Sequence, residues 1–230
     1  MKKIYFLFFL IISFGCEKEV PEIFSYPSIL ISREYKIMTE VKLFTKRGQI
    51  NDKTVIGNYL NKVAPGIFYQ NKDAFVPINK PDTLNYYSTD TVLFSIPGIW
   101  GKRVAKQEGS YLFFYMPDTL IGFKSLQQDS EFKSIINGIG IYKPYYNDLH
   151  FYGSIYQEVF NAFIARGNPN RLEFPQITYR ITRRGNNSYY AGYSSKNYNN
   201  VFDPNVLKLL QEGDTLAIQE AKIVYLKHNK

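Results

Sequence analysis

The sequence predicts a mainly β protein, an antiparallel curved sheet or barrel-like domain with two or three short helices. Segments in which apolar and polar residues alternate, as in strands, outnumber segments with apolar residues at helical spacing. Most connections between these segments are as short as hairpin turns. Hydrophobic residues make up 45% and aromatic residues 17% of the 230 residues, which supplies enough apolar surface for a packed core. We therefore expect neither a disordered chain nor a coiled coil. No shift in composition marks an internal boundary, so residues 33–230 are predicted to form a single domain.

The first fifteen residues have the layout of an export signal. Two lysines precede an apolar run at 4–14, which is too short to cross a bilayer of about 30 Å as a helix. Gly15 and Cys16 follow, and Cys16 is the only cysteine, so no disulfide can form within the chain. The segment resembles a bacterial lipoprotein signal. This resemblance implies that residues 1–15 are a cleaved signal peptide and that Cys16 is the lipid attachment site, whose acyl chains anchor the protein to a membrane.

Residues 16–32 are predicted to be a lipidated, flexible tether, because they contain two prolines and show no sustained periodicity. The charged residues at 17–19 resemble the export signal of surface lipoproteins of the Bacteroidetes type. The resemblance implies an envelope protein, anchored in the outer membrane and exposed on the cell surface. Two alternatives to the lipoprotein signal are an ordinary secretory signal with an incidental cysteine and an uncleaved anchor. The alternative to an export signal at 17–19 is a plain solvated linker.

The first half of the domain is predicted to be a strand, a helix and a meander. Alternating apolar and polar residues at 35–45 predict the clearest strand. Asn51 or Asp52 is expected to cap a helix that stops before Pro65. A meander with a hairpin at 107–109 follows. Its predicted strands are 83–87, 91–96, 102–107 and 110–116.

The triplet Asp-Thr-apolar occurs four times. The intervals are unequal, so a tandem repeat is excluded. An Asp that closes a turn before a β-branched residue suffices to explain them, so we interpret them as strand starts and not as paired catalytic carboxylates. The triplets begin at Asp82, Asp90, Asp118 and Asp214.

In the second half, the apolar stripe at 154–166 predicts a helix, although a long bent strand remains an alternative. Segments 176–182 and 188–193 are predicted to form a hairpin. Asp203 and the proline after it indicate a short helix that is followed by a last strand at 215–227. The apolar face of this strand changes parity near residue 219, which predicts a β-bulge.

The net charge is +8 and falls to +6 when the two lysines of the signal peptide are removed. The basic residues form short pairs near turns, and no long basic run suggests nucleic acid as a partner. Attraction to anionic lipid headgroups or acidic glycans is open, with solubility at hairpin tips as the favoured interpretation. The pairs are Lys46-Arg47, Lys102-Arg103 and Arg183-Arg184.

Motifs for catalysis, metals and cofactors are missing from the sequence. Of the two histidines, His228 is near the C-terminus, and no Gly-x-Ser-x-Gly motif provides a serine nucleophile for His150. A histidine-dependent catalytic triad is therefore not expected. No zinc pattern, P-loop or dinucleotide fingerprint is present, and we predict no cofactor and no metal. A pair of carboxylates remains an open route to hydrolysis. The candidate acids are Asp118, Glu131, Asp148, Glu158 and Glu173.

Tyrosines gather around the second predicted hairpin, and exposed tyrosines can stack on sugars or anchor a protein. The candidate binding surface consists of Tyr189, Tyr190, Tyr193 and Tyr198. The sequence thus predicts a membrane-anchored, non-enzymatic binding or interaction module whose partner is a glycan or an envelope protein. The alternatives are a lipocalin-like carrier and an acid-pair hydrolase. A roomy pocket enclosed by the sheet would favour these alternatives, and a filled interior would favour the binding module.

Overall fold

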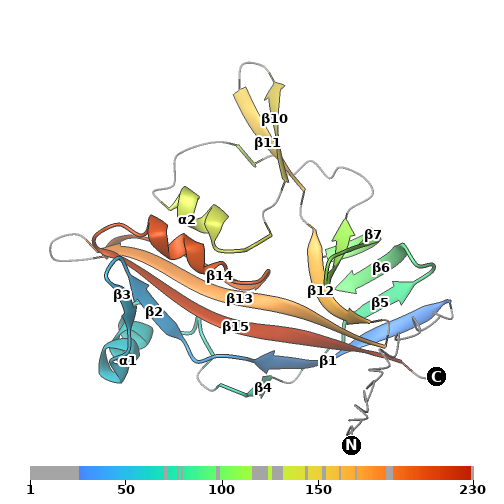
Figure 1. The fold of residues 1–230 in the computed structure, drawn as a ribbon, viewed down its shortest axis with the longest axis horizontal. Helices are drawn as coiled ribbons and strands as arrows, with labels where there is room; N and C mark the ends of the chain where they lie inside the picture. Colours follow the sequence, from blue (N-terminus) through green and yellow to red (C-terminus); the bar gives the residue numbers. More distant parts are fainter. Residues whose placement is uncertain are drawn as a thin grey trace, which may run out of the picture.

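A computed structural model describes residues 26–69, 72–76, 78, 80–96, 99–115, 124–125, 132–142, 145–151, 154–160, 162–168, 170–184 and 189–228. As predicted, the protein is mainly β, with a closed eight-stranded antiparallel barrel and three short helices among these residues (Figure 1). The signal peptide and Cys16 lie outside the described residues. The first strand begins at Ser28, so residues 28–32 belong to the sheet and not to the tether.

The barrel closes because its two longest strands pair with each other and also with the two strands that flank the meander. Every neighbouring pair around the ring is antiparallel. In order around the ring, the strands are β1 (Ser28–Ile37), β5 (Thr83–Tyr86), β6 (Thr91–Ile96), β7 (Ile99–Glu108), β8 (Tyr111–Tyr115), β12 (Phe163–Asn168), β13 (Arg171–Arg184) and β15 (Asp214–Lys227).

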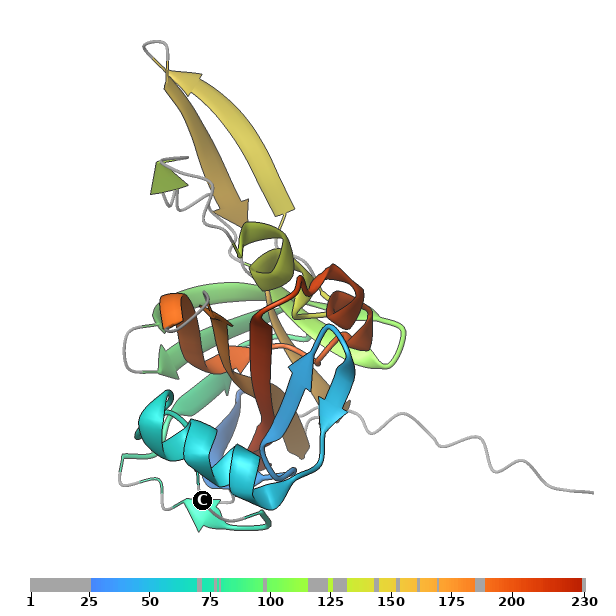
Figure 2. The same cartoon turned by 90° about the vertical axis from the view of Figure 1, so that its left-hand side faces the viewer.

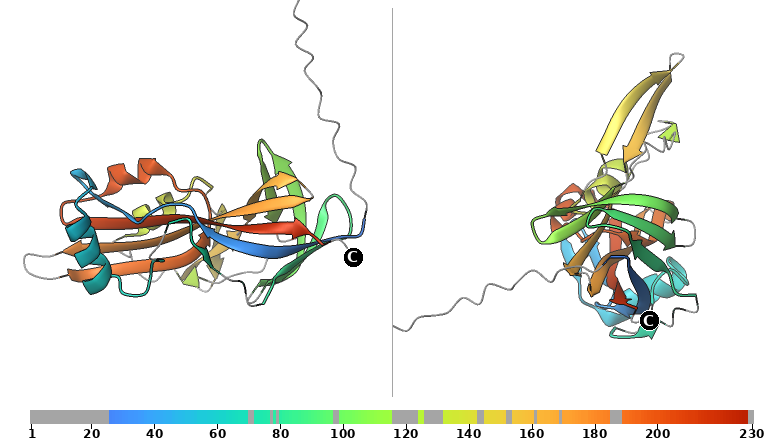
Figure 3. Two further views of the ribbon diagram at one scale, coloured as in Figure 1. Left: turned by 90° about the horizontal axis from the view of Figure 1, so that it is seen from below. Right: turned by 90° about the vertical axis from the view of Figure 1, so that its right-hand side faces the viewer.

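Strands β13 and β15 each have 14 residues and continue beyond the barrel into an open sheet. Figure 3 shows these two strands running the length of the protein, with the barrel at one end and the open sheet at the other. The open sheet is completed by β2 (Lys42–Thr45) and β3 (Gly48–Ile50) beside β15, and by β14 (Tyr189–Asn199) beside β13. The remaining strands are β4 (Phe75–Val76), which pairs with β1, and a separate sheet of β9 (Lys124–Ser125), β10 (Tyr145–Phe151) and β11 (Ser154–Phe160).

Aromatic rings fill the described interior of the barrel. Phe94 and Phe114 are fully buried with ring centroids 5.1 Å apart, and Phe174 lies 5.6 Å from Phe114. Tyr86 and Tyr225 extend the same cluster. An eight-stranded barrel is just wide enough for side chains to fill, and here they form an ordinary packed core.

Helices cover both faces of the open sheet, as Figure 2 shows. On one face, Tyr59 of α1 packs with Leu43 and Ala217. On the opposite face, α2 and the 3₁₀ helix η1 cover a cluster that includes Ile181 and Leu216. The predicted cap is confirmed, because the Asp52 carboxylate accepts hydrogen bonds from two backbone N–H groups of the first turn of α1. The helices are α1 (Lys53–Lys62), α2 (Lys133–Gly138) and η1 (Pro204–Leu209).

The predicted bulge in β15 is wrong. The ladder between β13 and β15 runs without a register shift from Arg171↔Leu226 to Arg183↔Asp214. Leu216 faces α2 and η1, whereas Tyr225 faces the interior of the barrel. Because successive side chains point to opposite sides, the apolar parity changes where the covered face changes.

The helix predicted for 154–166 is also wrong, and the alternative of one long bent strand is correct only in type: the segment contains β11 and the start of β12, which belong to different sheets and pair with four other strands. Its aromatic and β-branched residues suit a ladder as well as a helical stripe, and partner strands decide between them.

The strand predicted for 35–45 is broken, because β1 ends at Ile37 and β2 begins at Lys42. The backbone N–H groups of Met38 and Thr39 both donate to the Glu220 carbonyl at this break.

The other predicted elements are confirmed. The meander and its hairpin at Gly109 are present, and β13 and β14 form the second predicted hairpin. Asp203 caps η1 by accepting a hydrogen bond from the Asn205 N–H. Strands begin at or just after Asp82, Asp90 and Asp214, which confirms the interpretation of these residues as strand starts, while Asp118 lies outside the described residues.

Candidate anion-binding cleft

The predicted tyrosine surface lies on β14 and just beyond the barrel. The side chains of Tyr189, Tyr190 and Tyr193 are outside the described part of the structure. Tyr198 is half-buried: its ring centroid lies 6.2 Å from that of Tyr179, and its hydroxyl accepts a hydrogen bond from Asn200 Nδ2 at 3.1 Å. Tyr198 therefore takes part in the packing beneath α2 and η1.

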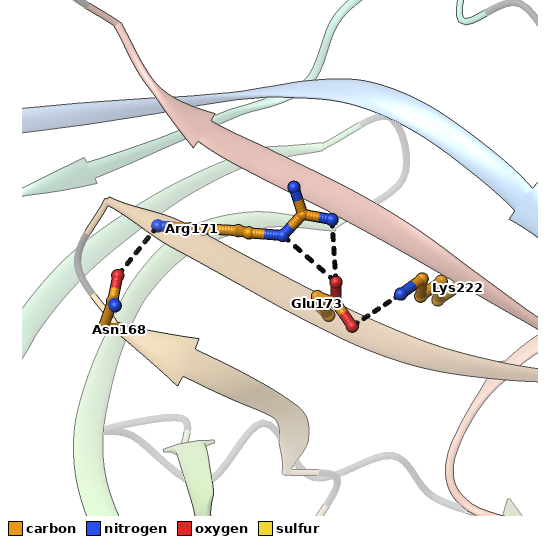
Figure 4. A network of polar contacts seen from close by, with 4 residues as sticks. All are labelled: Asn168, Arg171, Glu173 and Lys222. Carbon is orange, nitrogen blue, oxygen red and sulfur yellow. Dashed lines mark hydrogen bonds and ion pairs between the residues drawn. The ribbon is translucent and has the colours of Figure 1, made fainter.

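Among the candidate acids, Glu173 is held between two cations (Figure 4). Arg171 donates to Oε1 from Nε at 3.1 Å and from Nη2 at 2.9 Å, and Lys222 Nζ donates to Oε2 at 2.8 Å. Burial opposes ionisation, but the hydrogen bonds and charges of Lys222 and Arg171 outweigh it and lower the pKa of Glu173. A general acid needs a raised pKa, so this carboxylate does not suit the general-acid role in acid-pair hydrolysis.

The other candidate catalytic residues gain no support. Asp118 and Glu131, and the side chains of Asp148, His150 and Glu158, lie outside what the structure describes. The described part of the chain holds no group of three or more His, Cys, Asp or Glu side chains that could bind a metal.

A cleft of about 690 Å³ opens where α1 meets the ends of β13 and β15 and the β2–β3 turn. Apolar side chains of α1 and the sheet line part of it, and the Tyr59 hydroxyl lies 3.1 Å from Thr182 Oγ1, which fixes α1 to β13. The apolar lining consists of Leu43, Ile50, Val55, Tyr59 and Val63.

Four cationic side chains line the same cleft, which we call the basic cleft: Lys46, Arg47, Lys62 and Arg184. The pair Lys46-Arg47 and one member of the pair Arg183-Arg184 therefore meet here through the ladders of β15 with β2 and with β13. Sequence reasoning identified the pairs but not their meeting, and it missed Lys62 on the helix.

Carboxylates balance the four cations only in part. Glu212 pairs with Arg47 at 2.7 Å, but their side chains are 66% and 82% exposed, so this contact stabilises the fold by only about 0–1 kcal/mol. Among the described residues of the lining, the other carboxylate is that of Asp214, which is buried against Arg183, a residue that does not line the cleft. Among the described residues, no ion pair is found for Lys46 or Lys62, and both are exposed. The cleft therefore presents a net positive charge to solvent.

The loop between η1 and β15 is rigidly supported. Arg183 donates from Nε to Asp214 Oδ1 at 2.6 Å and from Nη2 to Oδ2 at 3.1 Å, and the Gln211 N–H donates to Oδ2 at 2.8 Å. Gly213 has φ +87°, and a Cβ there would lie 2.7 Å from the Arg184 carbonyl oxygen, so only glycine fits. This framework fixes the backbone on which Arg184 and Glu212 reach the cleft.

Neighbouring arginines in β13 serve different faces. The Arg183 guanidinium lies 5.1 Å from the ring centroid of Phe132, next to α2. Arg184 points to the other face and lines the basic cleft. The arrangement can bind an anion that also offers an apolar surface, since it combines several cations with an apolar lining.

Comparison with known proteins gives no family for this chain. No protein-family model matches it, and no curated protein and no solved structure is significantly similar to it.

Proposed function

We propose that this protein is a non-enzymatic binding module, held at the cell envelope by a lipid on Cys16, that binds an acidic glycan in its basic cleft. The observation that supports this proposal is the meeting of Lys46, Arg47, Lys62 and Arg184 around a cleft whose described lining has one exposed carboxylate. The volume of about 690 Å³ is that of a small-ligand site and holds a short oligosaccharide segment.

A glycan that carries carboxylates matches the mixed lining of the cleft. The acidic groups would pair with the lysines and arginines, and the apolar face of a sugar ring would lie on residues such as Val55 and Ile50. The Asn58 amide can both donate to and accept from sugar hydroxyls.

The position of the cleft favours a ligand other than the headgroups of the anchoring membrane. The start of β1 lies beside the end of β15, because Leu30 pairs with Lys227 and the His228 N–H donates to the Ile29 carbonyl. The cleft lies at the opposite end of β15, and a strand of 14 residues spans about 45 Å. A lipid on Cys16 would therefore attach the barrel end, and the cleft would lie at the end of the sheet farther from the point of attachment.

Neutralising two lysines tests the glycan proposal. The double variant Lys46→Gln/Lys62→Gln is expected to bind a uronate oligosaccharide about tenfold more weakly at low ionic strength, because two exposed charges are removed. Isothermal titration of the mature chain at 20 and 300 mM salt measures this change and its loss at high salt.

The matched control, Lys102→Gln/Lys208→Gln, removes the same charge from exposed positions away from the cleft and should bind like the parent. Equal weakening in both double variants would reduce the effect to net charge and refute the cleft as the site. If the protein bound an acidic peptide but no glycan, the glycan proposal would be refuted and the ligand class would be acidic peptides.

Membrane attachment is proposed to depend on the lipid. No helix of the described residues combines the length and the apolar character needed to span a membrane. Cys16→Ser should move the protein from the membrane fraction to the soluble fraction and abolish labelling by an acyl-chain probe, whereas Ser25→Ala should change neither. Membrane partitioning that survives Cys16→Ser would disprove the anchor.

The barrel fold is compatible with the alternative of a lipocalin-like carrier. Its described interior is filled by rings such as Phe94 and Phe114, so a bulky ligand would have to displace them. Arg103, which is buried in that interior, nevertheless favours a small ligand.

A further inference from the structure

Arg103 is a buried cation without a carboxylate partner among the described residues. Its side chain belongs to β7, and the residue is only 3% exposed. Nη1 donates to the Lys102 carbonyl at 3.2 Å, and Nε has no hydrogen-bond partner. The guanidinium carbon lies 5.8 and 5.9 Å from the ring centroids of Phe94 and Phe163.

Such a residue is costly to the folded state unless an anion neutralises it. A guanidinium remains charged in proteins, even though burial lowers the pKa of Arg103, so its charge has to be compensated where it lies. Contacts with two aromatic faces offset only part of that cost. A buried polar group without a partner needs an explanation, and a bound anion is one that also neutralises the charge.

We infer that Arg103 forms an anion site inside the barrel, which binds the carboxylate of a small apolar acid. Nε and Nη2 form one edge of the guanidinium, and among the described residues neither has a hydrogen bond. This edge matches the two oxygens of a carboxylate in side-on, bidentate geometry.

Space and surroundings select the kind of acid. Gly101 precedes Arg103 on the same side of β7, and apart from the two chain neighbours of Gly101 the only described atom within 4 Å of a Cβ built there is Arg103 Nη1, at 3.9 Å. The neighbouring walls are Val92, Phe94 and Phe163, so the body of the ligand should be apolar. The site is separate from the basic cleft, and either proposal can fail without the other.

Decanoate is the probe that we choose, with decanol as its uncharged counterpart. The mature chain carries Cys16→Ser so that no acyl chain competes, and binding is followed by thermal shift and by the fluorescence of Trp100, the single tryptophan. Decanoate should raise the Tm of this protein and decanol should not. Arg103→Met should weaken decanoate binding at least about tenfold, with an unliganded Tm equal to or above that of the parent.

Lys102→Met is the matched control, because it removes the same charge from the exposed neighbouring position of β7. It should bind decanoate like the parent. Arg103→Lys keeps the charge but loses the bidentate edge and should bind several-fold more weakly, which tests the site even if Arg103→Met does not fold. The inference would be overturned if either Arg103 variant bound decanoate as tightly as the parent does, or if the parent did not respond to decanoate. Arg103→Met should leave glycan binding in the basic cleft unchanged.

Discussion

Replacing Asp214 with alanine is expected to lower the free energy of unfolding by about 3–5 kcal/mol, because it breaks an ion pair whose carboxylate is fully buried. The Asp214 side chain is 0% exposed and that of Arg183 is 12% exposed, and two hydrogen bonds join them. The Gln211 N–H loses its acceptor in the same variant. Urea unfolding of the mature chain at neutral pH measures the loss.

Glu212→Ala is the matched control, because Glu212 lies two residues from Asp214 and pairs with the exposed Arg47. This variant should cost less than about 1 kcal/mol. The double variant Arg183→Met/Asp214→Ala should recover part of the loss, since it removes both buried charges. An Asp214→Ala protein within about 1 kcal/mol of the parent would show that the pair does not support the loop. Since this loop positions Arg184 and Glu212, the folded variant should also bind the proposed glycan more weakly.

Replacing Phe114 with alanine is expected to cost about 3–5 kcal/mol of unfolding free energy, the usual range for a buried phenylalanine. Phe114 is fully buried, and its ring centroid lies 5.1, 5.6 and 6.4 Å from those of Phe94, Phe174 and Tyr86. Truncation would leave a cavity at the centre of the barrel that the closed ladder cannot collapse to fill. The measurement is again urea unfolding, together with the Tm.

Phe75→Ala provides the comparison, because Phe75 is 60% exposed and its truncation should cost no more than about 0.5 kcal/mol. Similar losses in the two variants would contradict the packed interior of the barrel. Folded Phe114→Ala should bind the proposed glycan like the parent, since the basic cleft lies beyond the barrel. The two largest predicted effects therefore separate the barrel from the cleft.

The strength of local signals explains how much of the fold was predictable. The cap at Asp52, the hairpin at Gly109 and the strand start at Asp90 depend on interactions within a few residues, which the sequence contains in full. The segment 154–166 failed because its aromatic residues suit a helix or a strand, and the partners that decide are far away in the chain.

The candidate site was predictable only in its parts. The basic pairs at Lys46 and Arg183 are visible in the sequence, but only the ladders of β15 bring their turns together, and only the pleat sends Arg184 to the cleft and Arg183 away from it. For the same reason, nothing in the pair Lys102-Arg103 showed that the first residue is exposed and the second lies in the core.

The sequence by itself determined the β class, the turns and caps, and the expectation of a lipid on Cys16, because propensities, turn chemistry and signal patterns act over short stretches of chain. The tertiary structure decided the closure of the barrel, the two covered faces of the open sheet, the basic cleft and the burial of Arg103. These features depend on which distant strands pair and in which register, and a shift of one residue would turn every side chain to the other face.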